Sequence, residues 1–135
     1  MIDPLGALIA ELRTAGIASG RVRGGEPAPG DAKTPFQRFV VLVRLGGPRL
    51  HRAPIQFLRI GVRAYAPTYQ DAAALYGEIS DAVDNVGGRM SAADLPIYQT
   101  LDDTGGAAAK DPDTDQPYES GVIQLIAGTE VLAGS

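Results

Sequence analysis

The clearest strands of the chain are FQRFVVLVRL, residues 36–45, and IQFLRIGVRAYA, residues 55–66. Both stretches alternate side chains of different character, as strands do when one face of a sheet packs on a core. The segment GGPRLHRAP joins them and predicts an antiparallel hairpin with a long basic loop. The residues that we expect in the core of this hairpin are Val41, Val43, Ile60 and Val62.

Two helices are predicted, one on each side of the hairpin in the sequence. Residues 4–15 carry leucine and isoleucine at helical spacing, and Asp3 and Pro4 suit the N-cap and first helical position. Residues 69–86 follow Thr68, a good N-cap residue, and Gly87-Gly88 is a natural end for that helix. Each helix has one apolar stripe, so we expect both to pack on a sheet.

Shorter strands are predicted at 17–23, 95–102 and 118–127, and Gly- and Pro-rich loops at 24–35 and 103–117. We expect both loops to lack fixed structure in an isolated subunit, because they have few apolar anchors. The order of elements predicts an α+β fold in which a mainly antiparallel sheet carries two helices on one face. The length of 135 residues favours a single domain, 1–135.

Charge is divided unevenly along the chain. The net charge is -4, but residues 1–67 hold ten Lys/Arg and four Asp/Glu, whereas residues 68–135 hold two and twelve. If the two halves stay apart in space, one copy can attract the opposite pole of another; the alternative is a solvated surface with uneven charge. No apolar run reaches the ~18 residues of a membrane helix, and Asp3 stands where a signal peptide would be basic.

Residues for catalysis or metal binding are few. The chain has no cysteine, and its single histidine, His51, lies in a basic loop. The spacing of Asp111, Asp113 and Asp115 begins like a calcium loop, but the following Gln116 and Val122 do not fit one, and turn chemistry is the alternative. We therefore expect no enzyme, no cofactor and no metal. An enzyme would require carboxylates such as Asp102, Asp103 and Asp111 to meet in a cleft.

Four arginines share parity on the two long strands, and we expect them on the face opposite the core, among aromatic side chains. Such a face can be a subunit interface, in which arginine and aromatic residues are enriched. It can also be a solvated face, or a platform that binds single-stranded nucleic acid. The residues are Arg38, Arg44, Arg59 and Arg63.

The chain resembles the tail-completion proteins, or tail terminators, of long-tailed bacteriophages. The stretches that carry the resemblance are Arg63-Ala64-Tyr65-Ala66 with Tyr69-Gln70-Asp71-Ala72, and Asp111-Pro112-Asp113-Thr114 with Pro117-Tyr118. They are short motifs within residues 5–127, the part of the chain that the resemblance covers.

The resemblance implies a structural virion protein of the phage neck, assembled in the host cytoplasm. Its subunits would form a homo-oligomeric ring, usually a hexamer, that caps the tail tube and joins it to the head-tail connector or stopper protein. DNA would pass through the ring without sequence-specific binding, and no membrane is involved. The expected interface or channel residues are the four arginines together with Asp111, Asp113 and Asp115. The alternatives are another head-tail neck component and a small nucleic-acid-binding module that uses the arginine face.

Overall fold

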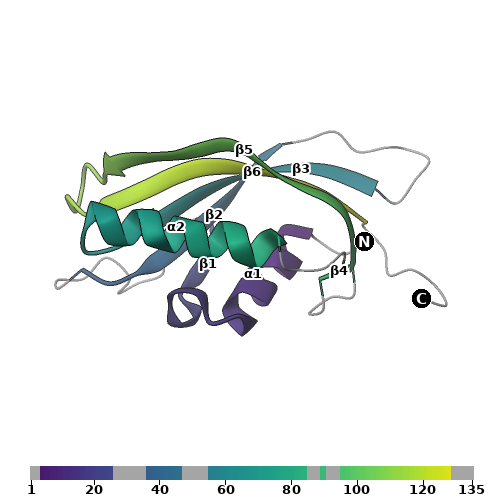
Figure 1. Ribbon diagram of the computed structural model, residues 1–135, viewed down its shortest axis with the longest axis horizontal. Helices are drawn as coiled ribbons and strands as arrows, with labels where there is room; N and C mark the ends of the chain where they lie inside the picture. The colour runs from purple at the N-terminus through teal and green to yellow at the C-terminus, as the bar shows by residue number, and fades with distance from the viewer. Residues whose placement is uncertain (1–3, 26–35, 47–54, 85–88, 91–94, 129–135) are drawn as a thin grey trace.

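The protein is an α+β structure, a mainly antiparallel sheet with two helices on one of its faces (Figure 1). The sheet has the strand order β1-β2-β3-β6-β5-β4, and only the β1–β2 pair is parallel. The computed structural model describes residues 4–25, 36–46, 55–84, 89–90 and 95–128.

The N-terminal segment forms helix α1 (Pro4–Thr14), the 3-10 turn η1 (Ile17–Gly20) and the short strand β1 (Val22–Gly24). The helix is confirmed to within one residue of the predicted end. The predicted strand 17–23 is wrong over its first part, because Ala18 and Ser19 have positive φ angles of 50° and 55°, which no strand permits. The turn is stabilised by packing, since Ile17 and Ala18 are buried in the core.

The predicted hairpin is confirmed as strands β2 (Phe39–Gly46) and β3 (Ile55–Tyr65), paired with Val40 opposite Ala64 and Leu42 opposite Val62. The core prediction is right for Ile60 and Val62, and Val41 is also buried, at 3% exposed, but in a second small cluster with Phe39 and Tyr65. Val43 is only half-buried against that cluster. Val40 and Leu42 face the helices, whereas Val41 and Val43 lie on the other face. A run of apolar residues in β2 leaves either parity possible, and pairing with β3 selects one.

Helix α2 (Tyr69–Asp84) packs lengthwise on the sheet (Figure 1). The Thr68 hydroxyl accepts a hydrogen bond from the Asp71 N–H at 3.1 Å, which confirms the predicted N-cap. Leu75, Ile79 and Val83 are at most 2% exposed and belong to one core with α1 and the sheet. The predicted stop at Gly87-Gly88 lies outside the described residues.

The C-terminal half of the sheet is more regular than predicted. It consists of β4 (Arg89–Met90), β5 (Leu95–Lys110) and β6 (Pro117–Gly128). The predicted loop 103–117 is wrong over most of its length, because residues 103–110 continue β5 and pair with β6 as far as Lys110 opposite Pro117. β5 has three register shifts, and the one between Thr104 and Ala107 contains both glycines, so pairing prevails over the weak strand propensity of Gly and Ala.

One glycine in this stretch has a steric role. A Cβ at Gly106 would lie 2.7 Å from the Cγ of Glu119 on the neighbouring strand. The Glu119 side chain therefore lies against the β5 backbone at a place where only glycine leaves room. The other predicted loop is 24–35. Its first residue, Gly24, is the last residue of β1, and residues 26–35 lie outside the described part of the chain.

Candidate assembly surface

The two faces of the sheet differ in what covers them. α1 and α2 pack on one face, which we call the helix-packed face. The opposite face carries the alternate side chains of β2, β3 and β6, and we call it the helix-free face, since neither α1 nor α2 packs on it. Its strand positions are Phe39, Val41, Val43, Leu45, Phe57, Arg59, Gly61, Arg63, Tyr65, Tyr118, Ser120, Val122, Gln124 and Ile126.

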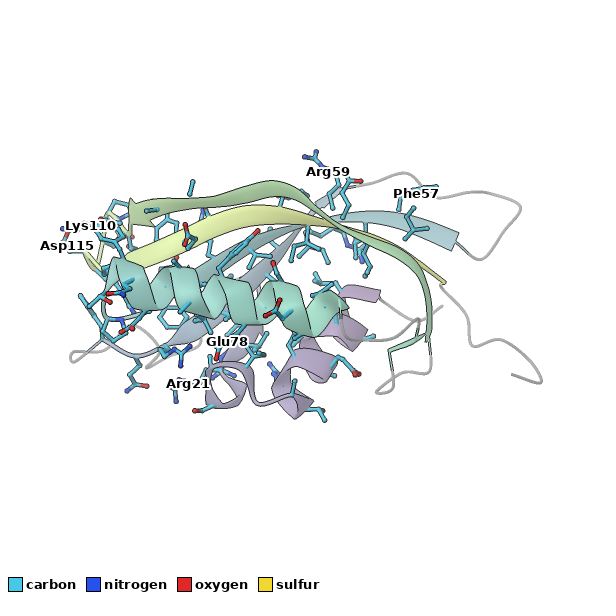
Figure 2. The ribbon with its side chains drawn as sticks, viewed as in Figure 1. Arg21, Phe57, Arg59, Glu78, Lys110 and Asp115 are labelled. Atoms are coloured by element: carbon cyan, nitrogen blue, oxygen red, sulfur yellow. The ribbon has the colours of Figure 1, made fainter. Side chains whose placement is uncertain are left out.

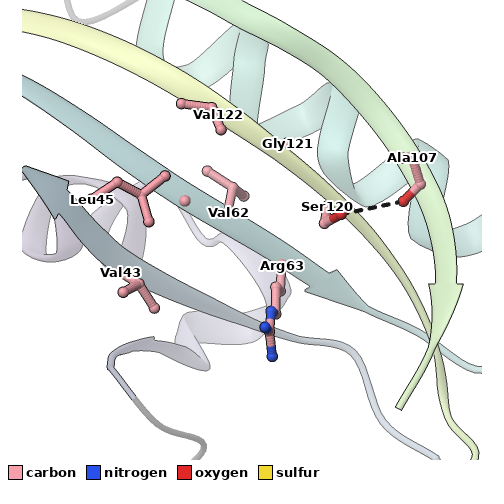
Figure 3. A pocket seen from close by; sticks show the side chains of 9 residues that line it. Val43, Leu45, Val62, Arg63, Ala107, Ser120, Gly121 and Val122 are labelled. Carbon is pink, nitrogen blue, oxygen red and sulfur yellow. Dashed lines mark hydrogen bonds between the residues drawn. The ribbon is translucent and has the colours of Figure 1, made fainter. Parts of the chain in front are cut away.

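A hollow of about 330 Å³ lies in the middle of the helix-free face (Figure 3). Its walls are mostly apolar, and they include Val43, Leu45, Val122 and Arg63. Gly61 forms part of the lining and has no side chain to fill the space. Leu45, which lies at the β2 register shift, extends over Gly61 and remains 49% exposed. The hollow is thus an apolar surface open to solvent.

A cluster of aromatic rings stiffens one end of this face. The rings of Phe39 and Tyr65 stack with centroids 4.3 Å apart and planes 7° apart, and Tyr118 lies 5.0 Å from Tyr65 at a tilt. The Arg63 guanidinium lies 5.5 Å from the centre of the Tyr118 ring. This cation–π contact holds Arg63 at the edge of the hollow.

Two pKa shifts belong to this cluster. Burial raises the pKa of Tyr65 above its ordinary value, and the hydrogen bond to Arg63 opposes that shift. The hydrogen bond with Tyr65 raises the pKa of Arg63 above its ordinary value, and burial opposes that shift. The hydroxyl of Tyr65 also donates to the Asp111 carboxylate at 3.5 Å, a long hydrogen bond.

The Asp-rich segment between β5 and β6 is a tight turn. The Asp111 carboxylate accepts hydrogen bonds from the N–H groups of Asp113, at 2.8 Å, and Thr114, at 3.2 Å. The Thr114 hydroxyl in turn accepts from the Gln116 N–H at 3.3 Å. Asp115 adopts a positive φ of 64°, and its carboxylate lies 3.7 Å from the Lys110 ammonium. The turn chemistry that the sequence offered as the alternative to a calcium loop is confirmed.

Gln116 is a structural residue that the sequence did not reveal. It is fully buried, and its amide nitrogen donates to the carbonyl oxygens of Gln37, at 2.8 Å, and Ala66, at 3.5 Å. These bonds join the turn to the segments that precede β2 and follow β3. A glutamine beside an Asp-rich turn carries no sequence signal of burial, because its partners are backbone groups far away in the chain.

The four predicted arginines do not share one face. Arg38 lies on the helix-packed side, where its guanidinium is 2.6 Å from the Glu78 carboxylate of α2. Arg44 is opposite Ile60 and has the same parity as Val40 and Leu42. Only Arg59 and Arg63 belong to the helix-free face; Figure 2 shows Arg59 on the far side of the strands from Glu78. Arg38 and Arg44 lie on the helix-packed side because β2 presents the opposite face to the core from the one that was predicted. The predicted surface of four arginines is therefore reduced to two.

The outward surface of α2 has the opposite charge. Asp71, Glu78 and Asp81 are exposed along it, and the helix contains no lysine or arginine. Tyr69, in its first turn, is 43% exposed. Tyr69 and Leu45 are the large hydrophobic residues left exposed in the part of the chain that the structure describes. The outward surface of α2 is therefore acidic, although Arg38 pairs with Glu78 there, whereas the helix-free face is largely apolar and carries Arg59 and Arg63.

In the described ranges, neither helix has the length and apolar character needed to cross a membrane. Within those same ranges, no three His, Cys, Asp or Glu side chains gather in a way that would hold a metal ion. Comparison of the chain with family models and with curated proteins found no match.

Proposed function

We propose that this chain is a structural assembly protein, the tail terminator of a long-tailed bacteriophage. In this proposal its copies form a closed ring, a hexamer, that caps the tail tube and binds the head-tail connector. DNA passes through the ring, and the chain has no catalytic role. The ring acts in the virion, at the junction of tail and neck.

The observation that supports assembly most is the chemical difference between the two sides of the molecule. A basic, apolar sheet face and an acidic helix face suit head-to-tail contact between copies, and heterologous contacts give rings when their rotation closes. The family itself is supported by the resemblance in the Asp111–Thr114 motif and in the transition from β3 into α2.

The acidic turn keeps the role predicted for it within this proposal. Asp113 and Asp115 are exposed, whereas Asp111 is half-buried and holds the turn together. Contact between this turn and a neighbouring subunit or the tail tube stays a prediction. The hydrogen bonds within the turn make it a rigid projection, so little ordering entropy opposes such a contact.

The test is assembly with purified tail tube protein. We expect the chain to give one discrete ring mass by native mass spectrometry, and to end tubes at a limited length in electron micrographs, with a ring at one end. Rings that bind the connector protein but leave tube growth unchanged would instead favour another neck component. Unlimited tubes together with a monomeric chain would contradict the proposal.

A DNA titration separates the assembly protein from a nucleic-acid-binding module. Two arginines on the helix-free face give at most two phosphate contacts, for which the slope of log K against log salt is roughly -2. We expect weak, sequence-independent binding. A markedly steeper slope for the monomer would favour the nucleic-acid-binding module.

A further inference from the structure

The two edges of the sheet differ in whether their outward backbone groups are bonded. At the β1 edge, the Arg21 carbonyl faces β2, where it accepts from the Val40 N–H at 2.9 Å, so the carbonyl of the next residue, Val22, faces outward. That outward carbonyl accepts hydrogen bonds from Nε of Arg13 at 2.9 Å and from its Nη2 at 2.7 Å. A side chain of α1 thus covers the β1 edge.

The opposite edge, along β5, is open. Among the described strands only β4 pairs on this side, and its partners are Leu95 and Pro96. The rest of β5 runs along the margin of the sheet as far as Lys110 (Figure 1). A row of backbone N–H and C=O groups of this kind is a template for one further strand.

The last residues of β5 show which backbone groups this edge presents. The Ala107 carbonyl accepts from a serine hydroxyl of β6 at 3.5 Å (Figure 3), and the Asp111 N–H donates to the carbonyl of Gln116, directly before β6, at 2.9 Å. Alternate residues of an antiparallel strand bond to the same neighbour, so the N–H and C=O groups of Ala108 and Lys110 point away from β6. Both of these residues are exposed.

Two residues of opposite charge lie at this edge on the same face of the sheet. Glu119, which is opposite Ala108, lies over Gly106, where a Cβ would be 2.7 Å from its Cγ and 3.0 Å from its Oε1. Lys110, two residues beyond Ala108, lies 3.7 Å from Asp115, but the two side chains are 50% and 81% exposed, so solvent screens this ion pair. Among the described side chains, no ion pair holds Glu119.

We propose that the β5 edge of one copy pairs antiparallel with the β5 edge of a second copy, about a two-fold axis at Ala108. In this register Ala108 is opposite Ala108 of the other copy, and Gly106 is opposite Lys110. The lysine of each copy then lies beside Glu119 of the other, above the glycine that leaves room for it, and the two-fold axis repeats this contact. The edge is therefore complementary to itself in both hydrogen bonds and charge, which selects a second copy as its partner.

This contact goes beyond the proposed function, and neither depends on the other. A two-fold contact joins two copies and closes no ring of its own. The proposed ring uses a heterologous contact through the helix-free face, which is a different surface from the β5 edge. One chain can therefore make both contacts, and variants of one contact leave the other intact.

A proline at the two-fold axis tests the backbone pairing. Ala108→Pro removes an N–H that points away from β6, so the bonds between β5 and β6 remain while the edge loses a donor. Ala108→Ser, which keeps that N–H, is the matched control. We expect Ala108→Pro to weaken dimer formation at least about tenfold in sedimentation experiments and the serine variant to match the wild-type chain. Melting temperatures report folding separately, and equal association of all three chains would contradict the pairing.

A charge exchange tests the register and keeps the proposal testable if the proline variant does not fold. Lys110→Glu and Glu119→Lys each place like charges opposite one another between copies, and each should weaken the dimer at least about threefold at low salt. The double variant restores opposite charges and should associate within about twofold of the wild-type chain. A double variant that is weaker than both single variants would show that these residues do not meet between copies.

A cross-link separates this dimer from a ring, because the chain contains no cysteine of its own. Directly opposite, hydrogen-bonded residues have Cα atoms about 5.5 Å apart, within the range of a disulfide, so Ala108→Cys chains should join rapidly in pairs. Thr14→Cys, an exposed position on α1, should react slowly. Equal rates, or a wild-type chain that stays monomeric, would overturn the inference.

The same variants separate this inference from the proposed function. Tube-capping rings from a chain whose Ala108→Cys variant reacts no faster than the α1 control would refute the edge contact but not the tail terminator. Rapid disulfide dimers of a chain that neither forms rings nor limits tubes would do the reverse.

Discussion

Neighbouring residues of strand β3 show the difference between the two faces of the sheet. Leu58, Ile60 and Val62 are at most 1% exposed under the helices, whereas Arg59 and Arg63, which alternate with them, are exposed on the helix-free face. The first set stabilises the fold by burial, at roughly 1.5–3 kcal/mol for each large apolar side chain. The second set contributes little to the core and lies on the face that we propose for contacts between copies.

The largest effect is expected when a charged residue is introduced on each face of β2 in turn, which tests the difference between the two faces. Leu42→Asp places an unpaired carboxylate among buried side chains of the helix-packed face and should lower the free energy of unfolding by more than about 4 kcal/mol. Val43→Asp, one residue on, lies half-buried on the helix-free face and should cost about 1–2 kcal/mol. Urea denaturation measures both. Similar costs would mean that the parity of β2 is not as described.

A smaller effect is expected where the turn joins the rest of the sheet. Gln116→Ala removes the hydrogen bonds to the Gln37 and Ala66 carbonyls and leaves the buried Ala66 carbonyl without this donor. We expect a loss of about 1–3 kcal/mol in thermal or chemical unfolding. Faster hydrogen exchange of residues 111–116 should accompany the loss, and a variant with unchanged stability and exchange would show that this glutamine does not fix the turn.

The aromatic cluster on the helix-free face predicts that the folded protein loses stability at alkaline pH. Because burial raises the pKa of Tyr65 above 10.0, the fold favours its neutral form. The resulting stability is complete below pH 10 and is lost as pH rises toward the higher pKa of the folded state. Tyr65→Phe cannot ionise, so its unfolding free energy should fall less steeply above pH 10 than that of the wild-type chain. Parallel curves for the two proteins would contradict this assignment.

The ion pair on the helix-packed side should contribute least. The side chains of Arg38 and Glu78 are 40% and 53% exposed, so solvent screens their attraction despite the short distance. We expect Glu78→Gln to change unfolding stability by less than about 1 kcal/mol, and 1 M salt to remove the difference. A larger, salt-independent loss would show that Arg38 belongs to the core on this face.

The sequence predicted the buried face of a strand correctly where polar and apolar residues alternate. The prediction failed where the pairing of strands determines the structure. In β3, arginines alternate with leucine, isoleucine and valine, so the buried face was predicted correctly. In β2, consecutive apolar residues leave both parities open, and only the register with β3 selects one. Residues 103–110 look like a loop because Gly and Ala have weak strand propensity, yet β6 provides hydrogen-bond partners for them.

The candidate surface was predictable in part. Arg59, Arg63 and the Asp-Pro-Asp-Thr turn were identified from their residue types. The hollow was not, because it depends on a register shift that moves Leu45 over Gly61. Such a shift follows from strand pairing and has no signature in the local sequence.

The central claim is that copies of the chain associate through the helix-free face, and matched charge reversals test it most directly. Arg59 and Arg44 are both exposed strand arginines, but they lie on opposite faces of the sheet. We predict that Arg59→Glu weakens self-association at least about tenfold in sedimentation experiments, while Arg44→Glu changes it less than about twofold and both monomers melt alike. Equal weakening by the two variants, or none by Arg59→Glu, would contradict the claim.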